Sequence, residues 1–164
     1  MRKFIDSYDM IFVDIDNTLI YGWYIELMHY GWKLFHNNYL SQLAMAIQNK
    51  FNLYKVNRKL VYSLKKGNIH SHRKVIFLTV RAESKATVDM VNRIMTEADD
   101  YFPLYEIVAL GTDNGHLDKA QYIYENYGDK KCLLIDDNNL NRETAEKFGI
   151  DTFNPVLLRE EFIG

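Results

Sequence analysis

Two aspartates stand one residue apart directly after a short apolar run near the start of the chain. Asp14 and Asp16 follow residues 10–13, and a second acidic pair, Asp136-Asp137, follows another apolar run. Carboxylates gathered this closely could not all stay ionised without a cation to screen them. Carboxylate oxygens are hard ligands that hold Mg²⁺, and a carboxylate in such a site can serve as a nucleophile or as a general acid–base.

Short apolar runs that alternate with helical patterns are the elements that position these residues. The runs are β-branched and aromatic and predict strands buried on both faces, at residues 10–13, 75–78, 105–110 and 132–135, with a weaker one at 150–153. Helical spacing occurs at 84–95, 118–127 and 141–148, with Ser84 as an N-cap and Gly149 as a C′ residue. This alternation predicts an α/β fold with a parallel sheet, in which ligands bind outside the carboxyl ends of the strands.

The segment of residues 20–72 is too long to be one crossover helix, and it predicts a small helical insertion beside the ligand-binding edge of the sheet. No acidic residue lies between Glu26 and Glu83, and this interval holds ten Lys/Arg, so its net charge is +10. The rest of the chain holds the other ten Lys/Arg and all 22 Asp/Glu, so its net charge is −12. Basic residues interleaved with Tyr and Trp suit phosphate binding and nucleobase stacking. A solvated basic helix face is the alternative interpretation.

Composition indicates a soluble globular chain, with 48% hydrophobic and 26% charged residues. The single cysteine, Cys132, cannot form an intramolecular disulfide or a multi-cysteine metal site, which suits a reducing cytoplasm. No apolar run approaches the roughly 18–20 residues that span a bilayer, and an acidic residue follows the first few residues before any signal-peptide core. We therefore expect a cytoplasmic protein without a membrane partner.

The motif at residues 14–19, Asp-Ile-Asp-Asn-Thr-Leu, resembles the D-x-D-x-T motif of the haloacid dehalogenase-like (HAD) phosphohydrolases. The remaining motifs of that superfamily occur in the same order: Thr79 ends the second strand, Lys119 opens a later helix, and Asp136-Asp137 ends the fourth. The resemblance extends over about residues 10–154, apart from the insertion. It implies a three-layer Rossmann-like core of residues 1–19 and 73–164, with a helical cap at 20–72.

The resemblance implies a Mg²⁺-dependent phosphatase that works through an aspartyl-phosphate intermediate. Asp14 is the implied nucleophile, and Asp16 is the implied general acid–base that protonates the leaving alkoxide and later activates water. Thr79 donates its hydroxyl to a phosphate oxygen. Lys119 offsets the negative charge of nucleophile and phosphate.

The implied ligands of Mg²⁺ are the carboxylates of Asp14 and Asp136 and the main-chain carbonyl of Asp16, with Asp137 as an outer-shell or water-mediated ligand. Three further residues are candidates for binding the substrate phosphate. They are Asn17, Thr18 and Arg81.

Asp16 distinguishes phosphoryl chemistry from dehalogenation, since a halide leaves without a proton and dehalogenases lack this carboxylate. Receiver domains carry a similar residue set in a different order.

The expected substrate is a small phosphomonoester, with a nucleotide or a nucleic-acid terminal phosphate favoured over sugar phosphates. Two alternatives remain: a catalytically idle HAD-fold scaffold or binding protein, and a nucleic-acid-binding protein that uses only the basic cap.

Overall fold

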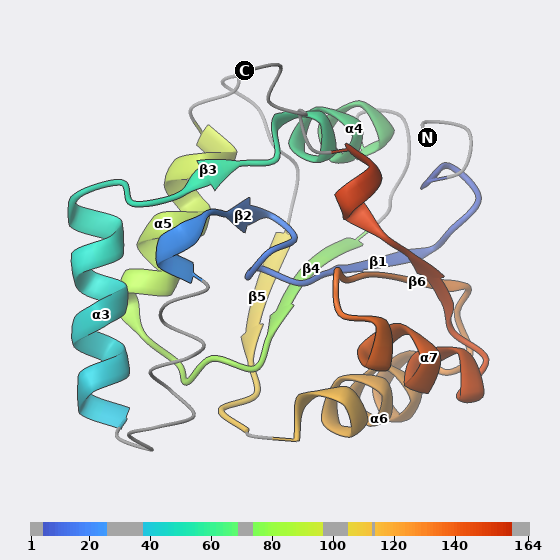
Figure 1. Ribbon diagram of the computed structural model, residues 1–164. Helices are drawn as coiled ribbons and strands as arrows, with labels where there is room; N and C mark the ends of the chain where they lie inside the picture. The colour runs from blue at the N-terminus through green and yellow to red at the C-terminus, as the bar shows by residue number, and fades with distance from the viewer. Residues whose placement is uncertain (1–4, 26–37, 69–73, 97–104, 113, 159–164) are drawn as a thin grey trace.

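The chain forms an α/β fold around a five-stranded parallel sheet with the strand order β5-β4-β1-β6-β7 (Figure 1). The structure is a computed structural model that describes residues 5–25, 38–68, 74–96, 105–112 and 114–158. The strands are β1 (Met10–Val13), β4 (Lys74–Thr79), β5 (Tyr105–Ala109), β6 (Cys132–Ile135) and β7 (Asp151–Phe153). The parallel sheet predicted from the apolar runs is therefore confirmed.

Helices cover both faces of the sheet and make it the middle of three layers. One face packs against α5 (Lys85–Thr96), and the other against α6 (Gly115–Tyr127) and α7 (Asn139–Lys147) (Figure 1). Alternate residues of β1 serve the two cores: Ile11 and Val13 join the α5 side, whereas Phe12 joins the α6–α7 side. The central strand is buried along its whole length, which is why it reads as an unbroken apolar run.

The predicted helix boundaries hold to within three residues. Ser84 caps α5, because its hydroxyl accepts a hydrogen bond from the Thr87 amide at 3.2 Å. Helix α6 begins at Gly115 rather than at residue 118. Helix α7 begins at Asn139 rather than at residue 141, because Asn138 caps it through the Leu140 amide at 2.9 Å. Gly149 ends α7 with a φ of +76°, as expected of a C′ glycine.

The described residues of the insertion between β1 and β4 include helices and a small sheet. Among these elements are β2 (Ile20–Tyr21), α3 (Asn38–Lys50), β3 (Lys55–Val56) and α4 (Arg58–Asn68). The antiparallel pairing of β2 with β3 was not predicted, because strands of two residues carry no readable periodicity. Ile20 pairs with Val56, so the two ends of the insertion meet where it leaves and rejoins the core.

Asn57 fastens the returning end of the insertion to the core. This buried side chain donates to the main-chain oxygens of Thr18 (3.3 Å) and Pro155 (3.4 Å), and its own oxygen caps α4 through the Leu60 amide at 3.2 Å. Its main-chain amide donates to the Leu19 oxygen at 2.9 Å. One asparagine thus joins the loop after β1, the start of α4 and the 3₁₀ turn Pro155–Leu158.

Helix α3 is held against α5 by polar contacts. Arg93 donates to the side-chain oxygen of Asn49 at 2.8 Å and also contacts the hydroxyl of Tyr54. Asn49 in turn donates to the main-chain oxygen of Ala86 at 3.4 Å. Met45, one turn earlier, is buried and accepts from the Thr87 hydroxyl. These contacts fix the position of α3 beside the carboxyl end of the sheet.

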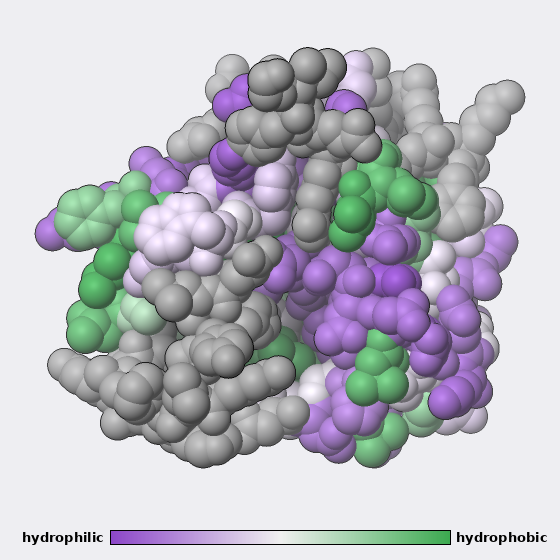
Figure 2. Space-filling model, viewed as in Figure 1, coloured by the Kyte–Doolittle hydropathy of each residue, from purple (hydrophilic) through white to green (hydrophobic). Residues whose placement is uncertain are grey.

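The basic residues of the insertion interval do not form one solvated face. Lys65 and Arg81 are buried, and Lys74 pairs with Glu106 at 2.5 Å. The exposed ones described are Lys50, Lys55, Arg58 and Lys59, while Lys33, Arg73 and the side chain of Lys66 lie outside the described residues. In Figure 2, hydrophobic side chains gather over α3, where Leu43, Ile47 and Phe51 are exposed.

No helix in the described part of the chain combines the length and the apolar character that crossing a bilayer requires.

Candidate functional site

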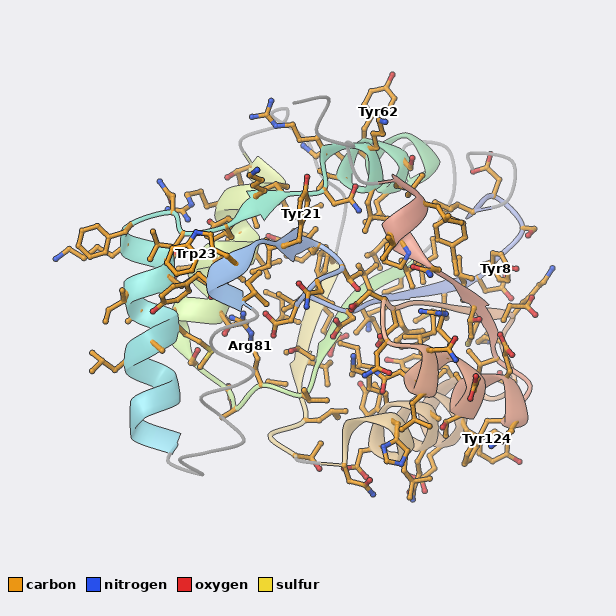
Figure 3. The ribbon with its side chains drawn as sticks, viewed as in Figure 1. Tyr8, Tyr21, Trp23, Tyr62, Arg81 and Tyr124 are labelled. Atoms are coloured by element: carbon orange, nitrogen blue, oxygen red, sulfur yellow. The ribbon has the colours of Figure 1, made fainter. Side chains whose placement is uncertain are left out.

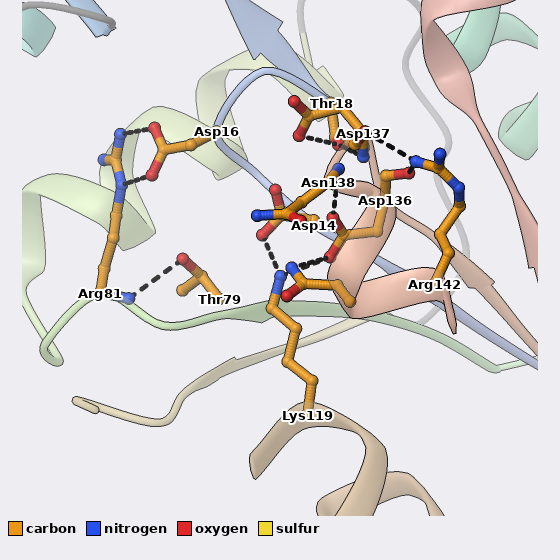
Figure 4. Close-up of polar contacts among 11 residues, drawn as sticks. Asp14, Asp16, Thr18, Thr79, Arg81, Lys119, Asp136, Asp137, Asn138 and Arg142 are labelled. Carbon is orange, nitrogen blue, oxygen red and sulfur yellow. Dashed lines mark hydrogen bonds and ion pairs between the residues drawn. The ribbon is translucent and has the colours of Figure 1, made fainter. Parts of the chain in front are cut away.

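Three carboxylates converge at the carboxyl ends of β1 and β6. The two strands pair in register with Val13 opposite Ile135, so Asp14 and Asp136, the next residues, emerge side by side. The Asp14 amide donates to the Ile135 oxygen at 2.9 Å, which fixes this register up to the site. Carboxylate oxygens of Asp14, Asp136 and Asp137 lie within 4.8 Å of one another (Figure 4). That spacing allows one cation to bridge all three.

Lys119 places its ammonium between two of these carboxylates. Its Nζ lies 2.5 Å from Oδ1 of Asp14 and 2.7 Å from Oδ2 of Asp136, and its side chain is almost completely buried. Burial alone would lower the pKa of Lys119, but the charges of Asp14 and Asp136 outweigh it and raise that pKa above its usual value. Lys119 therefore stays protonated and acts as a fixed positive charge in the site.

The contact with Lys119 does not fully offset the cost of burying the negative charge of Asp14. Burial raises its pKa well above the usual value; the Lys119 charge opposes that rise, and the neighbouring charges of Asp136 and Asp16 add to it. Among the described residues, no hydrogen bond reaches the second oxygen of Asp14. Lys119 contacts two of the three carboxylates, and every atom that the three carboxylates offer to a cation is a hard oxygen. The set therefore fits a divalent cation such as Mg²⁺ in both charge and ligand type.

Helix α7 supplies side chains that hold the acidic pair in place. The Asn141 amide group donates to Oδ2 of Asp136 at 2.9 Å, and the main-chain amide of Asn138 donates to Oδ1 at 2.9 Å. Arg142 donates to the main-chain oxygens of Asp136 (2.8 Å) and Asp137 (2.6 Å). Sequence reasoning missed Asn141 and Arg142. The available signal was their position in the first turn of a helix that starts directly after the acidic pair.

Thr18 connects the loop after β1 with the loop after β6. Its hydroxyl is completely buried, donates to Oδ1 of Asp137 at 3.3 Å and accepts from the Asp137 amide at 3.1 Å. Asn17, the residue before it, adopts a φ of +54°, a left-handed conformation that asparagine tolerates better than most residues. The turn at 15–19 closes on the Ile15 oxygen, which accepts from the Leu19 and Ile20 amides at 3.0 Å.

Asp16 lies outside the group of three carboxylates, because both of its oxygens bind Arg81. The guanidinium Nε donates to one oxygen at 2.7 Å and Nη2 donates to the other (Figure 4). Burial works against the charge of Arg81, but the Asp16 carboxylate outweighs it, so the pKa of Arg81 is raised. The other contact of Nη2 is with the side-chain oxygen of Gln48 on α3, at 3.3 Å. Sequence reasoning missed Gln48 because nothing in the helical spacing shows which polar position turns toward the site.

Thr79 ends β4 beside this ion pair. It is completely buried, and its hydroxyl oxygen accepts from the Arg81 amide at 3.2 Å. The following Val80 packs on Gly115: a Cβ at Gly115 would lie 2.3 Å from Cγ1 of Val80. Only glycine therefore allows α6 to start this close to β4, and this start positions Lys119 under the carboxylates.

The structure thus assembles Asp14, Lys119, Asp136 and Asp137 in one buried group and keeps Asp16, Thr79 and Arg81 together beside it. Neither a family model nor a curated protein matches the chain. The geometry of these residues therefore has to carry the functional assignment.

Proposed function

We propose that the chain is a Mg²⁺-dependent phosphomonoester hydrolase of the HAD type, with Asp14 as the nucleophile. The observation that carries the proposal is the buried contact of Lys119 with both Asp14 and Asp136, beside a third carboxylate at bridging distance. A phosphate monoester dianion repels an anionic nucleophile, so its hydrolysis needs positive charge placed around the attacking carboxylate. Lys119 supplies part of that charge. The remaining excess of carboxylates supports a divalent cation as the rest.

In the first step, an oxygen of Asp14 attacks the phosphorus and the bond from phosphorus to the ester oxygen breaks. The departing alkoxide takes a proton from Asp16, which is left as a carboxylate. The product on the enzyme is an aspartyl-phosphate. Lys119 holds the Asp14 carboxylate in position for attack, and Thr79 donates its hydroxyl to a phosphate oxygen.

In the second step, a water molecule attacks the phosphorus of the aspartyl-phosphate. The Asp16 carboxylate accepts the proton of that water, the bond from phosphorus to Asp14 breaks, and inorganic phosphate leaves. Asp14 and protonated Asp16 are then ready for another substrate. Asp14, Asp136, Asp137 and the main-chain carbonyl of Asp16 are the groups that would hold Mg²⁺, whose charge would neutralise phosphate oxygens and carboxylates together.

A nucleotide or a nucleic-acid terminal phosphate is the substrate that we favour. Support comes from Trp23, which is 69% exposed on the insertion, and from Lys50, whose ammonium lies 5.7 Å from the ring centre of the exposed Phe51. Exposed aromatic rings beside lysines suit base stacking and phosphate attraction. Figure 3 shows Trp23 beside α3, on the same side of the molecule as Arg81.

The test is hydrolysis of p-nitrophenyl phosphate with MgCl₂, with EDTA, and with two aspartate variants. Asp14→Asn should lower kcat by about 10³-fold or more, because the nucleophile is lost while the shape is kept. Asp89→Asn is the matched control: among the described residues Asp89 pairs only with exposed Lys85 on α5, so this variant should leave kcat unchanged.

Turnover that survives EDTA or Asp14→Asn would contradict the proposal. If Mg²⁺ binds and no phosphomonoester is hydrolysed, the catalytically idle alternative holds instead. If phosphate-bearing oligonucleotides bind in a salt-sensitive way without phosphate release, the nucleic-acid-binding alternative holds.

A further inference from the structure

Gln48 is a buried amide from the insertion with half of its hydrogen-bonding capacity unused. The residue is completely buried, and its side-chain oxygen accepts from Nη2 of Arg81 at 3.3 Å. Its Nε2 has no hydrogen-bond partner among the residues that the structure describes. Two N–H donors are therefore buried without an acceptor among these residues, which is rare in folded proteins.

The orientation of this amide follows from its neighbour. A guanidinium can only donate hydrogen bonds, so the amide oxygen has to face Arg81 and the NH₂ group has to face away from it. Exchanging the oxygen and the nitrogen would set two donors against each other. The unused donors are consequently a property of the site rather than of an ambiguous side-chain orientation.

Gln48 is also held rigidly. The next residue, Asn49, is bound by Arg93 of α5 at 2.8 Å and donates to the Ala86 oxygen at 3.4 Å. The main-chain oxygen of Gln48 accepts from the Leu53 amide at 3.0 Å. These contacts fix the main chain at Gln48, and the contact with Arg81 holds its side-chain oxygen.

We infer that Gln48 is a specificity-determining residue whose NH₂ group donates to an acceptor on the alcohol part of the substrate. The inference rests on the proposed phosphatase function. In the proposed mechanism Asp16 protonates the ester oxygen, and Nη2 of Arg81 binds both Asp16 and Gln48. One guanidinium nitrogen thus joins Gln48 to the group that meets the leaving alcohol, and Figure 3 shows Arg81 between α3 and the sheet.

The chemistry that satisfies Gln48 is a hydroxyl, ring oxygen or carbonyl a few atoms from the phosphate. Sugar phosphates and nucleoside monophosphates both carry such acceptors, and phenyl phosphate carries none beyond the ester itself. Because a buried donor with a missing acceptor is costly, the site should discriminate against phenyl phosphate relative to substrates that supply one.

The experiment compares kcat/KM of the full chain and of Gln48→Leu on phenyl phosphate, ribose 5-phosphate and nucleoside 5′- and 3′-monophosphates. Gln48→Leu should lower kcat/KM about tenfold more on substrates with the acceptor than on phenyl phosphate, where only the lost contact with Arg81 is felt. A loss shared by ribose 5-phosphate assigns the acceptor to the sugar, and a loss confined to nucleotides assigns it to the base.

Gln121→Leu is the control, since Gln121 is exposed on α6 and its side chain donates to Glu125, its one side-chain partner in the part of the chain that the structure describes. Gln48→Met provides a second variant of closer shape, and the melting temperature of each variant reports on folding. Equal losses on all substrates, or no loss on any, would overturn the role of Gln48 while leaving the phosphatase proposal intact. A native chain that hydrolyses none of these esters would overturn the proposed function and the role of Gln48 with it.

Discussion

Arg81 binds both carboxylate oxygens of Asp16, across 65 residues of sequence, with Nε on one oxygen and Nη2 on the other. The side chains are only 7% and 13% exposed. A carboxylate has about four lone-pair positions, and this contact uses one on each oxygen. In the proposed mechanism, the proton that Asp16 transfers therefore lies on one of the two positions that face away from the guanidinium.

The first prediction concerns the stability of this ion pair. Arg81→Met should lower the unfolding free energy by about 3 kcal/mol, because it leaves the Asp16 charge largely buried without its partner. Adding Asp16→Asn to Arg81→Met should restore part of that loss. Urea unfolding of the single and double variants measures the coupling.

The exposed pair Lys85–Asp89 provides the comparison, since removing it by Lys85→Met should cost less than about 1 kcal/mol. The contact indicates that Arg81 and Asp16 are coupled. If the losses of unfolding free energy in the two single variants simply add up in the double variant, that coupling is absent.

The second prediction concerns Lys119. Replacing it with methionine should destabilise the metal-free chain by about 3–5 kcal/mol, because Asp14 and Asp136 then face each other without their ammonium. MgCl₂ should recover more stability in Lys119→Met than in the native chain, since a divalent cation can replace the lost charge. Thermal unfolding with MgCl₂ and with EDTA measures both effects. A variant insensitive to MgCl₂ would show that the carboxylates do not hold the ion.

The third prediction concerns pH and Asp14. Its folded-state pKa is raised above 3.8, chiefly by burial, so folding favours the protonated form. The stability that this group contributes is complete below the unfolded pKa and is lost as pH rises through the folded one. In EDTA, the native chain should therefore lose stability relative to Asp14→Asn as pH rises from about 4 upward. Denaturant unfolding across pH measures the difference, and a difference that stays constant would refute the assigned cause.

The fourth prediction concerns Cys132 in β6. Burial raises the pKa of its thiol to about 11, and its Sγ lies 3.4 Å from the Tyr127 oxygen to which it donates. At pH 8 only about one thiol in a thousand is ionised, so alkylation by iodoacetamide should be slow in the folded chain. Labelling should accelerate strongly in urea. Rapid labelling under native conditions would mean that β6 opens far more readily than its buried position between β1 and β7 indicates.

The strands and the residues at their carboxyl ends could be predicted because each leaves a local signal. The run at residues 10–13 is buried on both faces, so no polar residue interrupts it until Asp14. Residues that act across the structure left no such signal. The partner of Asp16 is 65 positions away, and Gln48 is recognisable only once α3 is known to pack on α5. The β2–β3 ladder depends on tertiary contacts rather than on strand propensity.

The pairing of Ile20 with Val56 makes the insertion a unit that could be removed from the parallel sheet. Because the chain exits and re-enters at one point, a tight two-residue turn could join Tyr21 to Lys55 and leave the parallel sheet unchanged. The carboxylates and Lys119 would stay with the sheet, whereas Gln48 would depart with the excised cassette. Under the proposed function, reaction chemistry and substrate preference would thus lie on separable pieces of the polypeptide, and grafting a different cassette should change which esters are accepted while the proposed catalytic centre stays as it is.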